Sequence, residues 1–207
     1  MDLKDRFRGY LPVALDLETG GFDAVRNPLL ELACSFFRFE AESLSVTTTH
    51  AWSVDPFKGS TIDPASLKFT GIDLRDRQPP AVAEKDALSA FFKLVRAEMK
   101  AQGCHRAIMV AHNAAFDAGF LNAACSRQDV KRNPFHPFTT IDTAALGAVA
   151  YGHTVLRVIC ARADMRFEND QAHRAAYDVE RTAQLFSRIV NSWPLDTTSW
   201  STESPDA

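Results

Sequence analysis

Two carboxylates separated by a single residue, Asp16 and Glu18, end an apolar run that begins at Val13. On a β-strand, alternate side chains point to the same face, so both acids project together from the end of a buried strand. Like charges this close repel each other unless a cation lies between them. Hard oxygen ligands suit Mg²⁺ or Mn²⁺. The pair therefore predicts one half of a metal site.

Two further acids and one histidine stand at the ends of later elements. Asp117 follows His112-Asn113-Ala114-Ala115-Phe116, at a predicted strand-to-helix junction. Asp178 lies five positions after His173, a spacing that would splay the two side chains apart on a continuous helix. We therefore expect His173 in a loop and Asp178 in the first helical turn, where the helix dipole favours an acid.

Phosphodiester hydrolysis is the chemistry that these residues could perform. The reaction needs an activated water and stabilisation of charge on the leaving oxygen, and two Mg²⁺ ions about 4 Å apart provide both. Asp16 could bridge the ions, with Glu18 and Asp178 completing one coordination shell. Asp117 could hold the other ion directly or through water. A neutral His173 could accept the proton of the water near pH 7.

Each of these residues alone also has an ordinary structural explanation. Asp-x-Glu pairs are mostly solvated, and a single acid at a helix start usually stabilises that helix. A lone histidine is more often a surface or core residue than a base. We interpret a further acid, Asp142, as a helix cap or as a support behind the metal ligands.

The strands that must position these residues are indicated by runs rich in β-branched and aromatic residues. Three such runs open the chain as a meander, and two shorter ones follow later. Their expected ranges are Val13–Leu17, Leu29–Phe39, Thr47–Val54, Ala107–Ala111 and Thr139–Thr143. Two loops join these and later elements, a hairpin connection at Glu40–Ser45 and a loop with two prolines at Lys131–Phe138.

Apolar residues at spacings of three and four predict a helix over Ala83–Ala101. Further helices are expected from Asp63-Pro64 (a short helix or turn), after His112-Asn113, over Ala144–Tyr151, over Val155–Ala163 with Thr154 as its cap, and over about Ala176–Trp193. Strands followed by alternating helices and strands predict an α/β fold, a mixed five-stranded sheet flanked by helices.

The composition is that of one globular domain. The 207 residues carry a formal net charge of −3, with 46% hydrophobic and 24% charged residues. We expect a single domain over residues 1–193 and a polar tail over residues 194–207. No apolar run approaches bilayer length, which predicts no membrane span. The negative charge does not exclude nucleic acid, because local basic clusters can contact phosphates.

The cysteines indicate a reducing compartment. Cys34, Cys104, Cys125 and Cys160 show no C-x-x-C spacing, which argues against zinc and against a disulfide framework. The first ten residues lack the apolar segment of a signal peptide. We therefore expect reduced, mostly buried thiols in a cytoplasmic protein.

The segments Asp16-Leu17-Glu18, His112-Asn113-Ala114-Ala115-Phe116-Asp117 and His173-Arg174-Ala175-Ala176-Tyr177-Asp178 resemble the three exonuclease motifs of the DEDDh superfamily. The resemblance implies a ribonuclease-H-like fold and removal of nucleotides from 3′ ends with two metal ions. It also implies that the four acids are metal ligands and that His173 is the general base.

The likeness extends to the ribonuclease T family over about residues 5–193. It is carried by Asp5-Arg6-Phe7-Arg8-Gly9, by the segment from Gly103 to Asn113, and by Lys131-Arg132-Asn133-Pro134-Phe135-His136-Pro137-Phe138. It implies a homodimer that trims the 3′ ends of transfer RNA and other stable RNAs and digests single-stranded DNA. A basic patch on one subunit would feed RNA to the other. The residues that match this patch are Arg6, Arg8, Lys100, Arg106 and Lys131.

The same resemblance implies that four phenylalanines, Phe22, Phe69, Phe116 and Phe138, stack on the terminal bases. An aromatic face accepts any base, at about 1–3 kcal/mol per stacked base. Burial in the core is the alternative explanation for these residues. One position departs from the family pattern, because Ala65 stands where the family usually has a glutamate beside the terminal base.

Two alternatives to this interpretation remain at this point. One is another DEDDh enzyme, either an oligoribonuclease or a polymerase proofreading subunit. The segments around Arg6 and Asn133 argue against it. The other is a catalytically silent RNA-binding module, against which all five catalytic positions carry competent residues.

Overall fold

The computed structural model describes residues 2–193, which form a five-stranded sheet with strand order β3-β2-β1-β4-β5. The strands are β1 (Tyr10–Thr19), β2 (Leu29–Glu40), β3 (Ser43–Ser53), β4 (Arg106–Ala111) and β5 (Phe135–Asp142). The first three strands pair antiparallel, and β1, β4 and β5 run parallel. The predicted sheet of mixed direction is confirmed.

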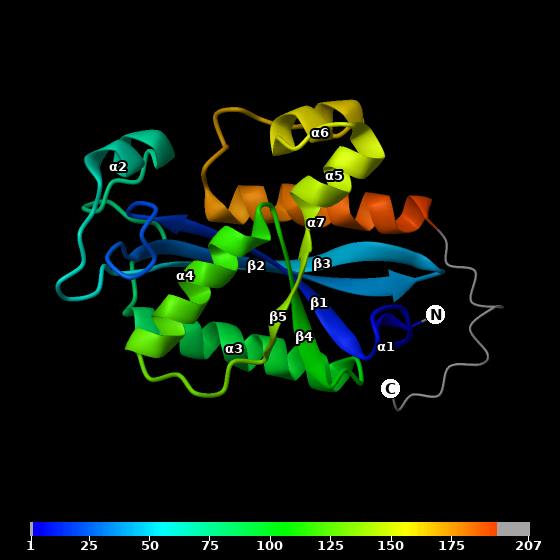
Figure 1. The fold of residues 1–207 in the computed structure, drawn as a ribbon, viewed down its shortest axis with the longest axis horizontal. Coiled ribbons are helices and arrows are strands. Elements are labelled where there is room, and N and C mark those ends of the chain that lie inside the picture. The colour runs from blue at the N-terminus through cyan, green and yellow to red at the C-terminus, as the bar shows by residue number, and fades with distance from the viewer. Residues whose placement is uncertain (1, 194–207) are drawn as a thin grey trace.

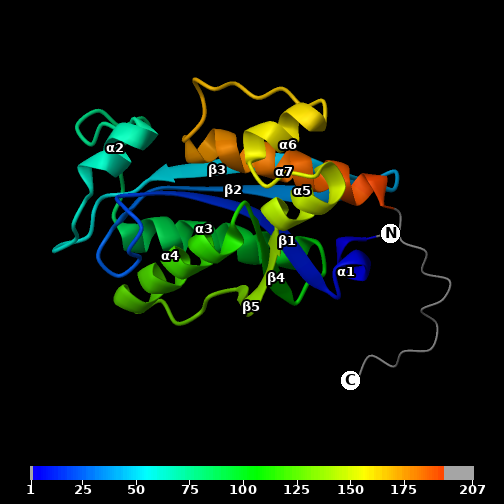
Figure 2. The ribbon, with the colours of Figure 1, turned by 45° about the horizontal axis from the view of Figure 1, so that its top comes forward.

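Helices cover both faces of the sheet. The helices are α1 (Leu3–Arg6), α2 (Pro64–Thr70), α3 (Glu84–Ala101), α4 (Ala114–Arg127), α5 (Thr143–Tyr151), α6 (Leu156–Arg162) and α7 (Ala175–Ser192). Figure 1 and Figure 2 show α7 on one face with α5 and α6 beside it, and α3 and α4 on the other face. The short helix α2 lies at the end of the molecule opposite α1.

Strand β1 is buried from Leu11 to Leu15, because helices pack on both sides of it. A continuous apolar run is what a strand needs in the middle of a sheet that is covered on both faces. On the α7 side, the core contains Val179, Ala183 and Phe186. The two acids therefore follow directly on a strand that is buried in the core.

The hairpin between β2 and β3 is tighter than expected. Strand β2 ends at Glu40 and β3 begins at Ser43. The two residues between them, Ala41 and Glu42, have φ values of 48° and 66° and form the turn. A two-residue turn with both φ values positive matches the twist of the flanking strands. The prediction of a longer connection at Glu40–Ser45 was therefore wrong at its edges, since tight pairing of the strands outweighed a polar sequence.

Strand β5 begins at Phe135, inside the segment predicted to be a loop. Its pairing with β4 shifts between Ala107, opposite Phe135, and Met109, opposite Thr140. The intervening residues, which include Pro137, therefore leave the ladder as a bulge. Proline is tolerated at such a place because it needs no ladder hydrogen bond there.

Helix α6 starts differently from the prediction. Its N-cap is Val155 and not Thr154, and no side chain caps its first turn. The carbonyl of Thr154 instead accepts a hydrogen bond from His112 Nε2, at 2.8 Å. The prediction of a threonine cap was wrong because the loop before α6 is held by a residue at the end of β4.

The segment Thr143–Arg162 is long and apolar enough to cross a membrane by length and composition, with a mean hydropathy of 1.4. One such segment is weak evidence for a span. Gly152, at φ 66°, divides it into α5 and α6. Neither helix approaches the length of about 20 residues that a bilayer core requires.

Candidate active site

Asp16 and Glu18 leave the same face of β1, as their spacing predicts. The strand pairs antiparallel with β2 here, which places Glu31 directly opposite Glu18. Directly after Glu18 the pairing shifts, and the ladder resumes at Thr19. This irregularity at the strand end turns the chain away from the sheet and leaves the two carboxylates facing a pocket.

Asp117 reaches the same place from the first turn of α4. Its side chain is only 4% exposed, and Oδ1 accepts a hydrogen bond from the backbone N–H of Leu17 at 3.1 Å. The N-cap of α4, Asn113, has φ 64°, a left-handed conformation that turns the chain sharply out of β4. Asp117 thus ties the start of α4 to the backbone between Asp16 and Glu18.

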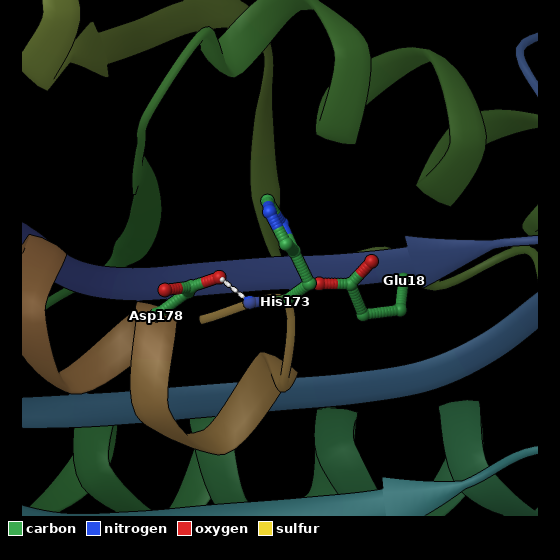
Figure 3. Close-up of side chains that lie close together, drawn as sticks. All are labelled: Glu18, His173 and Asp178. Atoms are coloured by element: carbon green, nitrogen blue, oxygen red, sulfur yellow. Dashed lines mark hydrogen bonds between the residues drawn. The ribbon is translucent and has the colours of Figure 1, made fainter. Parts of the chain in front are cut away.

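His173 lies in the loop before α7, and Asp178 lies in the first turn of that helix, as predicted. Asp178 Oδ2 accepts a hydrogen bond from the backbone N–H of His173 at 2.9 Å (Figure 3). One ligand atom each from Glu18, His173 and Asp178 lies within 4.8 Å of the others. Residues from the end of β1 and from the start of α7 with its preceding loop therefore lie close together.

The electrostatics of the cluster show how crowded these carboxyls are. Burial raises the pKa of Glu18 to about 8, and the negative charges of Asp178 and Glu31 add to the effect. Burial is also the largest cause that raises the pKa of Asp16 well above its ordinary value, followed by the charge of Asp117. Burial raises the pKa values of Asp117 and Asp178 in the same direction. A cation among these groups would stabilise their charged forms.

The residues present fit a divalent metal ion. Asp178 Oδ1 is buried and has no hydrogen-bond partner within residues 2–193. An unpaired buried carboxylate oxygen is costly unless a cation or donor satisfies it. The neighbouring metal-ligand atoms are carboxylate oxygens of Asp16 and Glu18, the ligand type that Mg²⁺ and Mn²⁺ prefer.

Three of the four predicted base-stacking phenylalanines line the same pocket as the acids. The pocket has a volume of about 360 Å³ and contains Phe22, Phe69 and Phe116 beside Asp16 and Glu18. Phe22 is 88% exposed and Phe69 is 68% exposed. Two large apolar rings exposed beside a polar cluster make this pocket a candidate surface for ligand binding.

Phe116 shares its packing between the pocket and the core. Its ring lies 6.2 Å from that of Phe22 and 4.8 Å from that of Phe120, which is buried. The half-buried ring of Phe116 therefore lies between Phe22 in the pocket and Phe120 in the core. Both positions that the sequence left open for this residue, beside the pocket and in the core, apply in part.

Phe138 is placed elsewhere. It lies in the bulge of β5, is 84% exposed, and packs edge-on against His136 with 4.6 Å between ring centroids. It does not line the pocket that holds Phe22, Phe69 and Phe116. The structure thus separates Phe138 from the other three, and a role in stacking stays a prediction.

Ala65 lies in the first turn of α2, where its backbone N–H donates to the N-cap residue Asp63 at 2.8 Å. The neighbouring Ser66 donates from Oγ to the carbonyl of Thr19 at 2.8 Å. This bond fastens α2 to the end of β1, beside the pocket. Ala65 is exposed beside Ser66, which lines the pocket, so this position next to the pocket carries no carboxylate.

Three of the predicted basic residues lie far along the sheet from the acids. Arg8, Lys100 and Arg106 are exposed, and Arg106 pairs with Tyr10 where β4 and β1 begin. Figure 1 shows the end of α3, the start of β4 and α1 at the same end of the molecule. From Tyr10 to Asp16 the strand spans about 20 Å at about 3.3 Å per residue.

The other two basic residues have partners within the chain. Arg6 donates from Nη2 to the carbonyl of Trp193 at 2.9 Å, and burial lowers its pKa. Lys131 is exposed and forms an ion pair with Asp129 at 3.6 Å. Arg6 therefore holds the end of α7, a role that the sequence did not indicate.

Three further residues support the site. The sequence indicated no individual role for Glu31 or His112, and only a general one for Asp142. Glu31 accepts a hydrogen bond from the N–H of Ala175 at 3.0 Å and so anchors the start of α7 to the sheet. His112 lines the pocket, and burial lowers its pKa. Asp142 caps α5, as expected, and also accepts from the N–H groups of Asn113 and Ala114.

The loop that carries Phe22 is braced by a buried ion pair. Arg127, at the end of α4, binds both carboxylate oxygens of Glu84 at 2.7 and 2.8 Å. It also donates to the carbonyl of Ala24 at 2.9 Å, and its guanidinium lies 4.3 Å from the ring centroid of Phe57. One side chain thus joins α3, α4 and the segment after β1.

Comparison with known proteins identifies the family. The family model RNase_T, described as an exonuclease, matches residues 13–186. Ribonuclease T of Shewanella oneidensis is 50% identical over 192 residues, which cover 92% of this chain and 86% of that protein. Ribonuclease T of Shewanella sp. (strain ANA-3) is 49% identical over the same shares of the two chains.

Solved structures agree on the fold. The zinc-bound form of the E. coli exonuclease I complex with single-stranded DNA matches with a TM-score of 0.69 at 15% identity, over 89% of this chain and 41% of that chain. The nuclease domain of 3′hExo, a DEDDh family member bound to rAMP, matches with a TM-score of 0.66 at 16% identity, over 87% and 92%. The chain therefore has the ribonuclease-H-like fold of DEDDh enzymes and belongs to the ribonuclease T family of 3′-to-5′ exonucleases.

Proposed function

We propose that this exonuclease trims single-stranded 3′ ends of transfer RNA and other stable RNAs with two Mg²⁺ ions, and that it also digests single-stranded DNA. The observation that carries the proposal is the convergence of Glu18, Asp178 and His173 within 4.8 Å, in a pocket lined by exposed phenylalanines. The relatives at about half identity are named for ribonuclease activity, which supports RNA as the main substrate.

In the proposed mechanism, the carboxylates of Asp16, Glu18, Asp117 and Asp178 hold the metal ions, with Asp117 acting directly or through water. The bound ions would supply Lewis-acid stabilisation of the charge that develops on the phosphate. His173 accepts a proton from the attacking water at an imidazole nitrogen. The hydrogen bond from its backbone N–H to Asp178 ties the loop that carries the base to the helical turn that carries a metal ligand.

The phenylalanines account for recognition of a strand end. Phe22 and Phe69 offer ring faces that accept any base, and such stacking requires unpaired bases. This property suits the unpaired 3′ end of transfer RNA and equally a single strand of DNA. With Ala65 next to the pocket, no side-chain carboxylate at that position discriminates among the terminal bases.

We also propose that the enzyme works as a homodimer. The support is the separation of about 20 Å along β1 between the acids and the exposed Arg8 and Arg106. A basic surface this far from the pocket suits contact with the body of an RNA whose end enters the partner's pocket. We propose a cytoplasmic location on the basis of the four free, buried cysteines, which suit a reducing compartment.

The test is incubation of the purified protein with uncharged transfer RNA, with and without Mg²⁺, followed by sequencing of the products. Release of mononucleotides from the 3′ end only with Mg²⁺ is expected. Asp16→Asn should abolish digestion and retain RNA binding, whereas Asp55→Asn, which removes an exposed charge, serves as the matched control. Normal digestion by Asp16→Asn, or internal cuts by the wild type, would contradict the proposal.

A further inference from the structure

We propose that Tyr177 and Arg181, on α7, are positioning residues that hold the loop bearing His173 and so place the general base. The inference rests on the proposed function of His173. Both side chains point back from α7 onto residues 166–168, upstream of His173 in the same loop. Neither residue lines the pocket that holds the acids.

The loop between α6 and α7, residues 163–174, has little structure of its own. Its backbone hydrogen bonds include Met165 N–H to the carbonyl of Cys160 at 2.8 Å and Gln171 N–H to the carbonyl of Glu168 at 3.1 Å. His173 has φ 65°, a left-handed conformation that is uncommon for residues other than glycine. Its backbone is held from outside the loop by the hydrogen bond of its N–H to Asp178.

Tyr177 supplies a contact further upstream in the loop. Its phenolic oxygen accepts a hydrogen bond from the backbone N–H of Glu168. Its ring meets that of Phe167 edge-on, with 5.5 Å between ring centroids and an interplanar angle of 75°. The polar and apolar parts of one side chain thus hold two consecutive loop residues.

Arg181 supplies the second contact, one helical turn further on. Its Nη1 donates to the carbonyl of Arg166 at 3.1 Å, and its guanidinium lies 5.1 Å from the ring centroid of Tyr177. The side chain is only 16% exposed, and its Nε is buried without a partner among residues 2–193. Its Nη2 also lies 3.7 Å from a carboxylate oxygen of Glu180, so this largely buried cation is held between the loop and its own helix.

These contacts act on His173 through the geometry of the helix start. Tyr177 and Asp178 are neighbours in the first turn of α7. Tyr177 holds the loop at Glu168, and Asp178 holds it at the N–H of His173. The intervening residues, 169–172, are therefore fastened at both ends to the turn that provides a metal ligand. Loosening one end lets the imidazole leave its position without moving the carboxylates.

The first experiment compares Tyr177→Phe, which removes only the hydroxyl, and Arg181→Met, which keeps the unbranched stem, with wild type. Each should lower kcat on a single-stranded RNA about tenfold, as expected for a misplaced base. KM and the Mg²⁺ concentration for half-maximal rate should stay unchanged. Tyr151→Phe and Arg188→Met are the matched controls and should behave like the wild type. A change in Mg²⁺ requirement with no change in kcat would overturn the inference.

A double-mutant cycle tests whether the effect passes through His173. In a His173→Ala background, measured by single turnover with excess enzyme, Tyr177→Phe should cost nothing further. The same tenfold loss in that background would show that Tyr177 supports the fold or the metal ligands, and would overturn its assignment to the base.

Hydrogen exchange provides a readout that does not depend on activity. In Tyr177→Phe and Arg181→Met, amides of residues 166–173 should exchange faster, while those of β1 and the C-terminal half of α7 stay protected. Unchanged exchange in the loop would overturn the inference even if RNA is digested. If the two variants show faster exchange in the loop but the wild-type protein digests no RNA, the proposed function fails and the contacts of the loop stand.

Discussion

The ring of Phe69 lies 4.1 Å from the imidazole of His173, with 42° between their planes. Phe69 belongs to α2 and His173 to the loop before α7, so two distant segments meet over the acids. Because Phe69 remains 68% exposed, its ring packs against the imidazole of His173 and still presents surface to solvent. Under the proposed function, this one side chain would connect recognition of a nucleobase with the position of the general base.

Phe69→Ala should therefore raise KM and lower kcat together. Loss of one stacked base costs about 1–3 kcal/mol of binding, or about 5- to 160-fold in KM. Removal of the ring beside His173 also frees the imidazole, which reduces kcat. Steady-state kinetics on a single-stranded oligonucleotide separates the two effects. Phe69→Leu is the control for side-chain volume, and kinetics equal to wild type in that variant would argue against a role for the aromatic ring.

His173→Ala should lower kcat by about 10²- to 10⁴-fold, the usual contribution of a general base. Binding of Mn²⁺, measured by calorimetry, should persist because the four carboxylates are intact. Turnover equal to that of the wild type would exclude His173 as the base.

The metal-free protein should become less stable as the pH rises from about 5 to about 8. The pKa of Glu18 is raised to about 8 in the folded state, so the folded protein holds a proton that the unfolded chain releases near its ordinary value of 4.5. Where the folded state binds more protons, the free energy of unfolding falls with increasing pH. Thermal melts in the presence of a chelator measure this change.

Mg²⁺ should reverse the effect, because a cation stabilises the charged carboxylates and binds most tightly when they are deprotonated. The stabilisation by Mg²⁺ should therefore be larger at pH 8 than at pH 6. Glu18→Gln, which cannot ionise, is the matched control and should show a weaker fall in stability with pH. A metal-free wild type whose stability falls no more steeply with pH than that of Glu18→Gln would contradict the raised pKa of Glu18.

Arg127→Met should destabilise the fold by about 3–5 kcal/mol, because it leaves the carboxylate of Glu84 buried without its charged partner. Urea denaturation measures the loss. The double variant Glu84→Gln/Arg127→Met removes both charges and should be more stable than Arg127→Met alone. A double variant that is less stable than the single one would show that the packing of Arg127 over Phe57 matters more than the ion pair.

The local patterns of the chain predicted most of the fold. The amphipathic spacing in α3 and α7 and the apolar runs of β1, β2 and β4 located these elements to within a few residues. They were predictable because burial of one helix face or of a whole strand leaves a period in the sequence. β5 was predicted too short, since its pairing with β4 resumes on both sides of Pro137, a residue that indicates a loop by itself.

The candidate site divides in the same way. The types and order of Asp16, Glu18, Asp117, His173 and Asp178 in the sequence were sufficient to predict metal-dependent phosphodiester chemistry and the loop position of His173. The contacts that hold these residues in place could not be predicted from the sequence. Asp117 bonds to the N–H of Leu17, and Arg6 to the carbonyl of Trp193, across separations of 100 and 187 residues.

The amino-acid sequence by itself therefore determined which chemical groups are present and which short element carries each of them. Only the tertiary structure decided their partners: Glu31 opposite Glu18, Phe69 over His173, Tyr177 on the loop, and Phe138 apart from the other rings. The physical reason is that periodicity and capping act over a few residues, whereas a bond between remote segments depends on how whole elements pack.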